Sequence, residues 1–234
     1  MAERCGYAEA YGRVSAELEL CRPQFGLLRV LEAGGGSASH VALPSDVDMT
    51  VIDMSPEQLA RNGARTKILG DLHSVEMKPA AYDMVVCWNV IEHLKTPGAV
   101  IDKFVGTVRP GGLIVLAWPD RASLAGLFTR LTPHAFHVLA LRHIFGMKDA
   151  GAPGRPPFKT FHRPEIGFDR IIARAADNGL EVAYAGRYEG NRFAKLCRRP
   201  VLGPLYRLTA RLGKAALGRD LRLSDIMLVL RRPC

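Results

Sequence analysis

Short apolar runs alternate with helical patterns through the first half of the chain. Five runs have the length and apolar character of buried strands, and they cover residues 27–33, 49–53, 66–71, 82–89 and 112–118. Helical spacing or helix-start signals cover residues 7–20, 55–64 and 97–108. Strands separated by helices predict a parallel sheet with right-handed crossovers.

The second half predicts one more helix and two more strands. The helix covers residues 164–180 and ends at Asn178-Gly179, where glycine can adopt the left-handed conformation of a helix cap. The two strands cover residues 181–188 and 225–232. They bring the number of predicted strands to seven.

Two segments interrupt this alternation and predict insertions. Residues 121–162 are rich in His, Pro and Gly, with a possible helix over residues 136–145, and residues 191–222 are strongly basic. A chain of 234 residues fits a single domain, residues 1–234, with an N-terminal helical segment over residues 1–25. We expect the two insertions to form a lid that determines substrate specificity.

Charge divides the chain into two unlike halves. Residues 1–120 hold 11 Lys and Arg against 15 Asp and Glu, whereas residues 121–234 hold 21 against 8. The apolar fraction of 48% is enough for a sizeable core and excludes a disordered composition. The charge asymmetry indicates a common core followed by a surface that meets an anionic partner.

The cysteines and the N-terminus bear on where the protein works. The five cysteines are scattered and form no C-x-x-C pair, which supports neither a disulfide framework nor a zinc knuckle. The charged N-terminus lacks a signal-type apolar core, and no run reaches the roughly 18 apolar residues of a membrane span. These features predict a cytoplasmic protein with reduced thiols.

Three consecutive glycines follow the first strand, in the stretch "VLEAGGGSAS". In a doubly wound sheet this first turn, placed between a strand and an expected helix, is where a nucleotide-like ligand approaches the backbone. Three strands in succession carry an acidic residue at this edge: Glu32 ends the first strand, Asp53 ends the second, and Asp71 follows the third. Asp53 is placed to accept hydrogen bonds from ribose hydroxyls, and Asp71 to reach an adenine amino group.

These motifs resemble the class I S-adenosylmethionine-dependent methyltransferases over residues 25–120. "VLEAGGGSA", "VIDMSPEQL", "GDLHSV", "YDMVVCWNVIEHL" and "VRPGGLIVLAW" are similar to the successive motifs of that family. The resemblance implies a Rossmann-like, seven-stranded, mostly parallel sheet with helices on both faces and an inserted lid. It also implies S-adenosylmethionine as cofactor and S-adenosylhomocysteine as product. The cofactor-binding residues that it implies are Glu32, Gly34, Gly36, Asp53, Met54, Asp71, Leu72 and Asn89.

A dinucleotide-dependent dehydrogenase is the competing interpretation. Such an enzyme prefers G-x-G-x-x-G, but Ala38 and Ser39 stand where that spacing needs glycine. Ala38 also replaces the third glycine of the methyltransferase motif, and we expect a slightly tighter loop from it.

Two residues at the sheet edge are candidates for catalysis. His93 follows the fourth strand and has a side chain suited to accept a proton near neutral pH, although it could instead simply pack near the cofactor. Asp120 follows the fifth strand and is expected to line the substrate pocket. His134, His137, His143 and His162 lack a carboxylate at ligand spacing, so we predict no metal site and expect them to line the acceptor pocket.

Residues 205–216 predict a basic amphipathic helix. Leu205, Leu208, Leu212 and Ala216 recur at helical spacing, and Arg207, Arg211 and Lys214 occupy the opposite face. Such a helix can lie on an anionic membrane surface, which would make the protein peripheral to a membrane, or it can simply pack on the sheet. The segment lacks interleaved aromatic residues, which argues against nucleic acid as a partner.

We therefore predict transfer of a methyl group from S-adenosylmethionine to a small-molecule acceptor, with a hydroxyl acceptor as first choice. The resemblance points to the branch that acts on small molecules, including quinone precursors. One alternative is an N- or C-methyltransferase for a lipid-linked or glycan intermediate at the membrane face. Another is a module that binds the cofactor without turnover. The sequence leaves the acceptor and the oligomeric state open.

Overall fold

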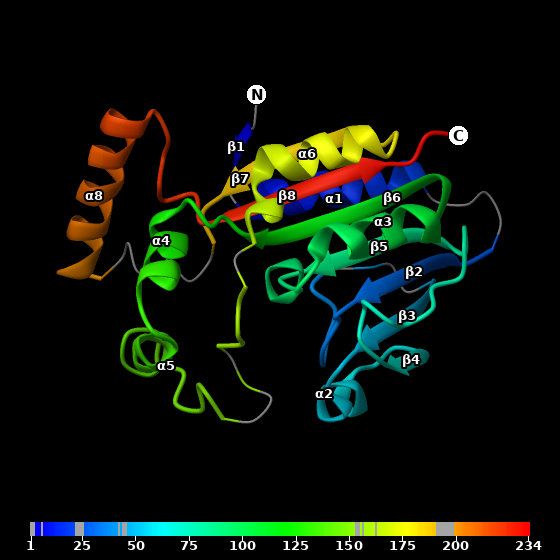
Figure 1. The fold of residues 1–234 in the computed structure, drawn as a ribbon, viewed down its shortest axis with the longest axis horizontal. Helices are drawn as coiled ribbons and strands as arrows, with labels where there is room; N and C mark the ends of the chain where they lie inside the picture. The colour runs from blue at the N-terminus through cyan, green and yellow to red at the C-terminus, as the bar shows by residue number, and fades with distance from the viewer. Residues whose placement is uncertain are drawn as a thin grey trace.

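Eight strands form one mixed sheet in the order β1-β7-β8-β6-β5-β2-β3-β4 (Figure 1). The structure is a computed structural model, and it describes residues 3–5, 7–21, 26–41, 43, 46–152, 155, 157–161, 163–190 and 199–234. The strands are β1 (Glu3–Cys5), β2 (Leu28–Ala33), β3 (Val47–Asp53), β4 (Thr66–Leu69), β5 (Tyr82–Trp88), β6 (Val108–Pro119), β7 (Glu181–Tyr188) and β8 (Asp225–Arg231).

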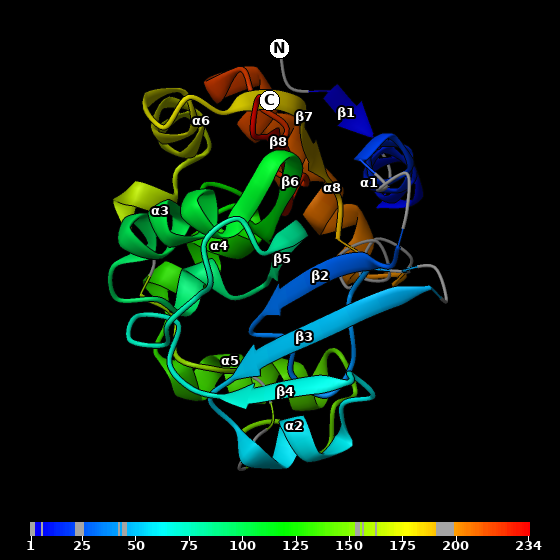
Figure 2. The same ribbon diagram turned by 90° about the vertical axis from the view of Figure 1, so that its right-hand side faces the viewer.

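The sheet confirms the predicted fold class. Only β8 runs against its neighbours, β6 and β7, and the other pairs are parallel. The seven predicted strands are present, and the short strand β1 adds an eighth because it pairs in parallel with the edge of β7. Figure 2 shows how the sheet twists between β1 and β4.

Helices cover both faces and also extend beyond one end of the sheet. They are α1 (Tyr7–Cys21), α2 (Pro56–Arg61), α3 (Pro97–Thr107), α4 (Leu124–Leu131), α5 (His134–His143), α6 (Phe168–Asp177) and α8 (Leu202–Leu217), with 3-10 turns η1 (Ile91–His93) and η2 (Pro164–Ile166). Ser55 caps α2, because its hydroxyl accepts a hydrogen bond from the Gln58 amide at 3.2 Å.

The sequence interpretation missed α4, although a signal for it exists. Its apolar residues Leu124, Leu127, Phe128 and Leu131 recur at helical spacing. Ser123 caps this helix, since its hydroxyl accepts a hydrogen bond from the Gly126 amide at 3.0 Å.

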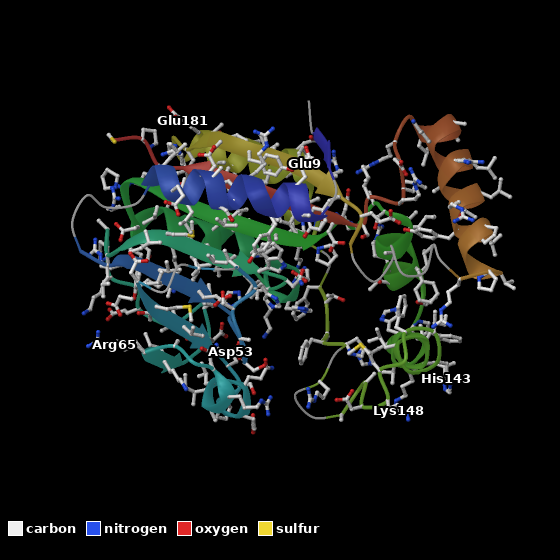
Figure 3. All side chains as sticks on the ribbon, turned by 180° about the vertical axis from the view of Figure 1, so that it is seen from behind. Glu9, Asp53, Arg65, His143, Lys148 and Glu181 are labelled. Carbon is white, nitrogen blue, oxygen red and sulfur yellow. The ribbon has the colours of Figure 1, made fainter. Side chains whose placement is uncertain are left out.

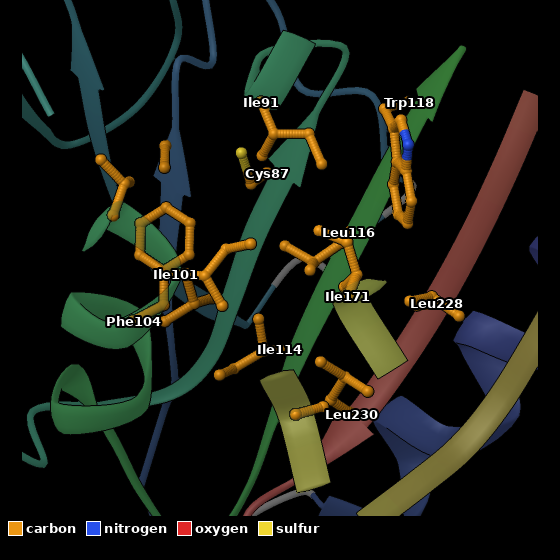
Figure 4. Packing of buried hydrophobic residues seen from close by; sticks show 14 of the residues in the cluster. Cys87, Ile91, Ile101, Phe104, Ile114, Leu116, Trp118, Ile171, Leu228 and Leu230 are labelled. Carbon is orange, nitrogen blue, oxygen red and sulfur yellow. The ribbon is translucent and has the colours of Figure 1, made fainter. Parts of the chain in front are cut away.

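Two apolar layers hold the helices on the sheet. On one face, Phe104 of α3 and Ile171 of α6 pack with Leu116 and Leu228 of the central strands (Figure 4). On the other face, α1 inserts two fully covered side chains, Val14 and Leu18, beside residues of β2, β5 and β8. The central strands are buried on both faces, which explains their near-continuous apolar sequence.

One local expectation is wrong. The described residues between β2 and β3 form turns and bends, so no helix follows the glycines in residues 34–41. The "RPGG" stretch lies within β6, which begins at Val108. The register between β5 and β6 shifts there, and Gly111 has φ +76, which marks an irregularity within a continuous strand.

The predicted insertions gather beyond the carboxyl ends of the parallel strands. Residues 121–152 supply α4 and α5, and the described part of the basic segment supplies α8 (Figure 1). Residues 191–198 and His162 lie outside the described residues. Among the helices that the structure describes, none combines the length and the apolar character needed to cross a membrane.

Candidate active site at the carboxyl edge of the sheet

The glycine loop begins with a residue that only glycine suits. Gly34 has φ +74, a conformation that side chains of L-residues rarely adopt. A Cβ atom added at this position would lie 2.4 Å from Cγ2 of Val90. Gly34 therefore permits close packing between the turns that follow β2 and β5, which is a structural reason for glycine that the sequence did not reveal.

Gly36 is held from both sides by polar side chains. Its amide donates to Oδ2 of Asp53 at 2.9 Å, and its carbonyl accepts from Nδ2 of the buried Asn62 at 2.9 Å. Oδ1 of Asp53 accepts a hydrogen bond from the Ser55 amide at 2.8 Å. Asp53 thus fixes the loop as well as lying where a ribose is expected. Figure 3 shows Asp53 toward α5, away from Arg65 at the start of β4.

Glu32 presents a buried carboxylate oxygen with no hydrogen-bond partner. The side chain is 1% exposed, and Oε1 accepts from the His40 amide at 3.1 Å while Oε2 accepts from nothing described. Burial raises the pKa of the Glu32 carboxyl, and the His40 amide opposes that rise. An unpaired buried oxygen is costly, and so it indicates a missing donor.

Aromatic side chains that the sequence analysis did not single out lie next to His40, whose amide donates to Glu32. The His40 ring stacks on Trp88 with centroids 6.2 Å apart, and the Tyr11 ring is tilted against Trp88 at 6.1 Å. The Tyr11 hydroxyl donates to the His40 carbonyl at 3.1 Å. The only sequence signal was the position of Trp88 at the end of its strand.

The third predicted acidic residue sits in a firmly held turn. Oδ1 of Asp71 accepts hydrogen bonds from the His73 backbone amide at 2.9 Å and from the ring Nδ1 of His73 at 2.7 Å. The hydrogen bond from the backbone amide is the largest cause of the lowered pKa of Asp71. Lys103 of α3 donates to the carbonyls of Leu72, His73 and Val75. The Asp71 carboxylate is partly exposed, whereas Leu72 is buried in the core.

Asn89 and Met54 lie at neighbouring strand ends with different surroundings. Asn89 has φ +54, a strained conformation for a residue other than glycine, and its amide donates to the Ala117 carbonyl at 2.7 Å. Its side chain is exposed. Met54 is 69% exposed, which leaves apolar area uncovered next to Asp53.

His93 has one ring nitrogen oriented by the backbone. Nδ1 lies 2.8 Å from the Lys159 carbonyl, and because a carbonyl only accepts, Nδ1 carries the hydrogen. Nε2 is then the acceptor of the neutral ring. Burial lowers the pKa of His93, and the bond to Lys159 opposes this. The Phe158 ring meets the imidazole edge-on at 6.0 Å.

Glu92, next to His93, is a second buried carboxyl with an unpartnered oxygen. It is 4% exposed, and Oε2 has no partner among the described residues. Burial raises its pKa to about 8, with a further contribution from Asp225. Oε1 lies 3.7 Å from Nε2 of His93, too far for a hydrogen bond. The charges of Glu92 and Glu32 also add to the burial that raises the pKa of the Cys87 thiol.

Asp120 is engaged in an ion-pair cluster. Its buried Oδ2 accepts from Arg187 at 3.1 Å and from Arg219 at 2.8 Å, and Oδ1 accepts from the Ala122 amide at 2.9 Å. These three hydrogen bonds engage both oxygens of the Asp120 carboxylate. The geometry favours a positioning role for Asp120 over a catalytic one.

Two histidines of the insertion, His134 and His137, form hydrogen bonds and pack against each other. His137 bonds to Thr132 at 2.9 Å and His134 to the Pro157 carbonyl at 3.1 Å. Within the described residues, no three His, Cys, Asp or Glu side chains are grouped to hold a metal ion.

Known proteins resemble this chain in sequence and in fold. A family model described as "Methyltransferase domain" matches residues 7–148. The ubiquinone biosynthesis O-methyltransferase of Psychrobacter arcticus is 29% identical over 170 residues, which cover 67% of this chain and 61% of that protein. The chain thus spans less than two thirds of that relative's length.

Two solved structures share the fold at low sequence identity. An S-adenosylmethionine-dependent methyltransferase from Mesorhizobium loti superimposes with a TM-score of 0.54 at 16% identity, covering 94% of this chain and 98% of that one. The [4+2]-cyclase SpnF superimposes with a TM-score of 0.54 at 13% identity, covering 98% and 84%. The second match shows that this fold carries more than one activity.

Proposed function

The chain belongs to the methyltransferase-domain family, and we propose that it transfers a methyl group from S-adenosylmethionine to a hydroxyl group of a small molecule. One observation carries this proposal. Glu32 and Glu92 are buried at the ends of the adjacent strands β2 and β5, and each has a carboxyl oxygen without a partner among the described residues. Such a pair of buried carboxyl oxygens without partners fits a site built for a polar ligand.

The residues at the edge fit the chemical groups of the cofactor. Oε2 of Glu32 would accept a hydrogen bond from the ammonium group of its methionine part, and Asp53 would accept from the ribose hydroxyls. Asp71 and Leu72 would contact the adenine, one through a carboxylate and the other through apolar area. Gly34, Gly36, Met54 and Asn89 complete the proposed surface around it.

The protein's own contribution to the reaction is alignment and proton removal. When bound, S-adenosylmethionine supplies an activated methyl group on a sulfonium centre. We assign His93 as the general base, because its Nε2 is an acceptor and its lowered pKa keeps the ring neutral at neutral pH. The Lys159 carbonyl orients the ring, and the Phe158 ring packs edge-on against it. The O-methyltransferase name of the Psychrobacter arcticus relative supports a hydroxyl acceptor.

The direct test is release of S-adenosylhomocysteine from S-adenosylmethionine in the presence of a panel of phenolic quinone precursors and other hydroxyl compounds. Calorimetric binding of S-adenosylhomocysteine is measured on the same protein. Binding without any turnover across the panel would favour the module that binds cofactor without chemistry. Failure to bind would overturn the proposal.

Asp53→Ala should weaken binding of S-adenosylhomocysteine by roughly 1.5–3 kcal/mol, because charge-assisted hydrogen bonds to the ribose are lost. Asp48→Ala, at the other end of the same strand, is the matched control and should leave the affinity unchanged. Asn62→Ala removes the hydrogen bond to the Gly36 carbonyl and leaves the Asp53 carboxylate unchanged. An equal loss in Asn62→Ala would assign the effect to loop shape and contradict ribose binding by Asp53.

A second proposal concerns where this reaction takes place. Helix α8 packs through the buried residues Tyr206 and Ala210, while Leu205 and Leu212 of another face are 58% and 60% exposed. Arg207, Arg211 and Lys214 lie on a further exposed face. An uncovered apolar ridge beside cationic side chains fits the surface of an anionic membrane. We propose peripheral membrane contact through α8.

Replacing Arg207, Arg211 and Lys214 together with glutamine should weaken binding to anionic vesicles by roughly 3 kcal/mol, since each basic residue near such a surface contributes about 1 kcal/mol. Co-sedimentation with phosphatidylglycerol vesicles measures this, and binding should fall as salt rises. The matched control replaces the exposed Arg61, Arg65 and Lys67. Wild-type protein that ignores such vesicles at low salt would rule out the membrane contact.

A further inference from the structure

Five arginines from five different segments line one cavity at the carboxyl edge. The cavity has a volume of about 310 Å³. Arg121 follows β6, Arg130 ends α4, Arg170 lies in the first turn of α6, Arg187 is near the end of β7, and Arg219 follows α8. Convergence of so many segments places this cationic cavity at the junction of the sheet and the two insertions.

The cavity has more positive than negative charge. Two carboxylates, Asp120 and Asp169, are the only acidic residues among those that line it, against five arginines. Asp120 pairs with Arg187 and Arg219. Within the described part of the chain, Arg121, Arg130 and Arg170 form no salt bridge and no side-chain hydrogen bond.

The unpaired arginines affect one another. Burial lowers the pKa of Arg121, repulsion from Arg130 and Arg170 lowers it further, and the charge of Asp120 opposes this shift. Arg187, which pairs with Asp120, is also held by the Phe168 ring, whose centre lies 3.9 Å from its guanidinium. Three arginines without a salt bridge around one hollow create a positive field that attracts an anion.

The cationic cavity lies beside the proposed methyl-transfer site. It opens at the end of β6, and β6 neighbours β5, which leads directly into η1 with Glu92 and His93. Neighbouring strands are about 4.8 Å apart. One segment borders both places, because Phe161 donates its amide to the Glu92 carbonyl at 2.9 Å while Pro164 and Gly167 line the cavity.

We infer that the cationic cavity binds the phosphate group of the methyl acceptor, which is therefore a phosphorylated small molecule. This inference rests on the proposed function in naming the ligand as the acceptor. Arginine forks match phosphate oxygens in pairs, and a doubly charged phosphate balances three unpaired arginines better than a single carboxylate does. Asp120 acts as a positioning residue that holds Arg187 and Arg219 at the wall of the cavity.

Phosphate binding can be measured without turnover. Calorimetric titration of the full chain with inorganic phosphate should show saturable binding, and acetate should bind more weakly. The double variant Arg121→Gln, Arg170→Gln should weaken phosphate binding by about tenfold to a hundredfold, as for lost hydrogen bonds to a charged group. Arg130→Gln gives a second, independent variant. Arg65→Gln, an exposed arginine far from the cavity, is the matched control and should bind as wild type.

The outcomes separate this inference from the proposed function. If S-adenosylhomocysteine binds but phosphate does not, only the cavity's assignment is overturned. If acetate binds as well as phosphate, or the double variant binds as wild type, the assignment is likewise overturned. If phosphate binds but S-adenosylhomocysteine does not, the proposed function fails and the cavity's ligand is not a methyl acceptor. The inference would be supported if phosphorylated hydroxyl compounds turn over at lower concentrations than their dephosphorylated counterparts. The double variant should lose this advantage.

Discussion

His93→Asn is expected to lower turnover by about 10²- to 10⁴-fold, the usual contribution of a positioned general base. The side-chain amide of asparagine can still donate to the Lys159 carbonyl, but it offers no basic nitrogen where Nε2 of the imidazole stands. Turnover is followed as release of S-adenosylhomocysteine with a saturating acceptor. Affinity for S-adenosylhomocysteine should be unchanged, because the proposed cofactor contacts lie elsewhere.

The pH dependence of turnover separates base catalysis from packing. Burial lowers the pKa of His93 below its usual value, so the neutral ring persists as the pH falls and is lost only below pH 6.5. Wild-type turnover should therefore fall on the acid side with an apparent pKa below 6.5, and His93→Asn should lack that limb. His137→Asn removes a histidine of the insertion and serves as the matched control. A His93→Asn variant that keeps wild-type turnover would contradict the assignment of the base.

The proposed cofactor edge carries local sequence signals. Glycines follow the first strand, acidic residues stand at or just after the ends of three successive strands, and the parallel sheet places those strand ends along one edge. Asp53 bonds to Gly36 only 17 residues away. Such short-range relations are encoded in motifs, and therefore the sequence indicated the fold and the proposed cofactor residues together.

The acceptor side was less predictable because its contacts span long stretches of chain. Asp120 meets Arg187 and Arg219, which are 67 and 99 residues further along the chain. The Lys159 carbonyl that orients His93 is 66 residues away. No sequence motif indicates any of these three partners. The sequence showed Asp120 at the right edge and a basic second half, but only the folded chain shows that the arginines converge on this residue.

The sequence predicts helix α8 but not which of its faces is buried. Leucines at helical spacing predict an amphipathic helix, and its bounds extend the predicted residues 205–216 by a few positions to Leu202–Leu217. Periodicity alone does not tell which apolar face is covered. The buried contact uses the side of Tyr206 and Ala210, with Leu221 packed against Gly213. The leucine face that the pattern made prominent is the uncovered one.

Glu92→Gln should abolish a pH-dependent loss of stability. In the wild type this loss lowers the free energy of unfolding by about 4 kcal/mol between pH 4.5 and pH 8. The folded protein holds the Glu92 carboxyl protonated up to a pKa of about 8, whereas the unfolded chain releases this proton near 4.5. Between these values the folded state binds the extra proton, so the free energy of unfolding falls as pH rises, by roughly 1.4 kcal/mol per pH unit. Below pH 4.5 both states are protonated and the full contribution is present.

Glutamine reproduces the neutral carboxyl at all pH values, so the variant lacks this loss. Urea unfolding of both proteins at pH 5 and pH 8 measures the effect, and the comparison between the two pH values cancels any fixed cost of placing an amide in the buried site. Relative to wild type, Glu92→Gln should be more stable at pH 8 than at pH 5 by several kcal/mol. Glu181→Gln, at an exposed position, is the matched control. An equal difference at both pH values would mean that Glu92 is ionised in the folded protein, and the imidazole of His93 would then face a charged neighbour.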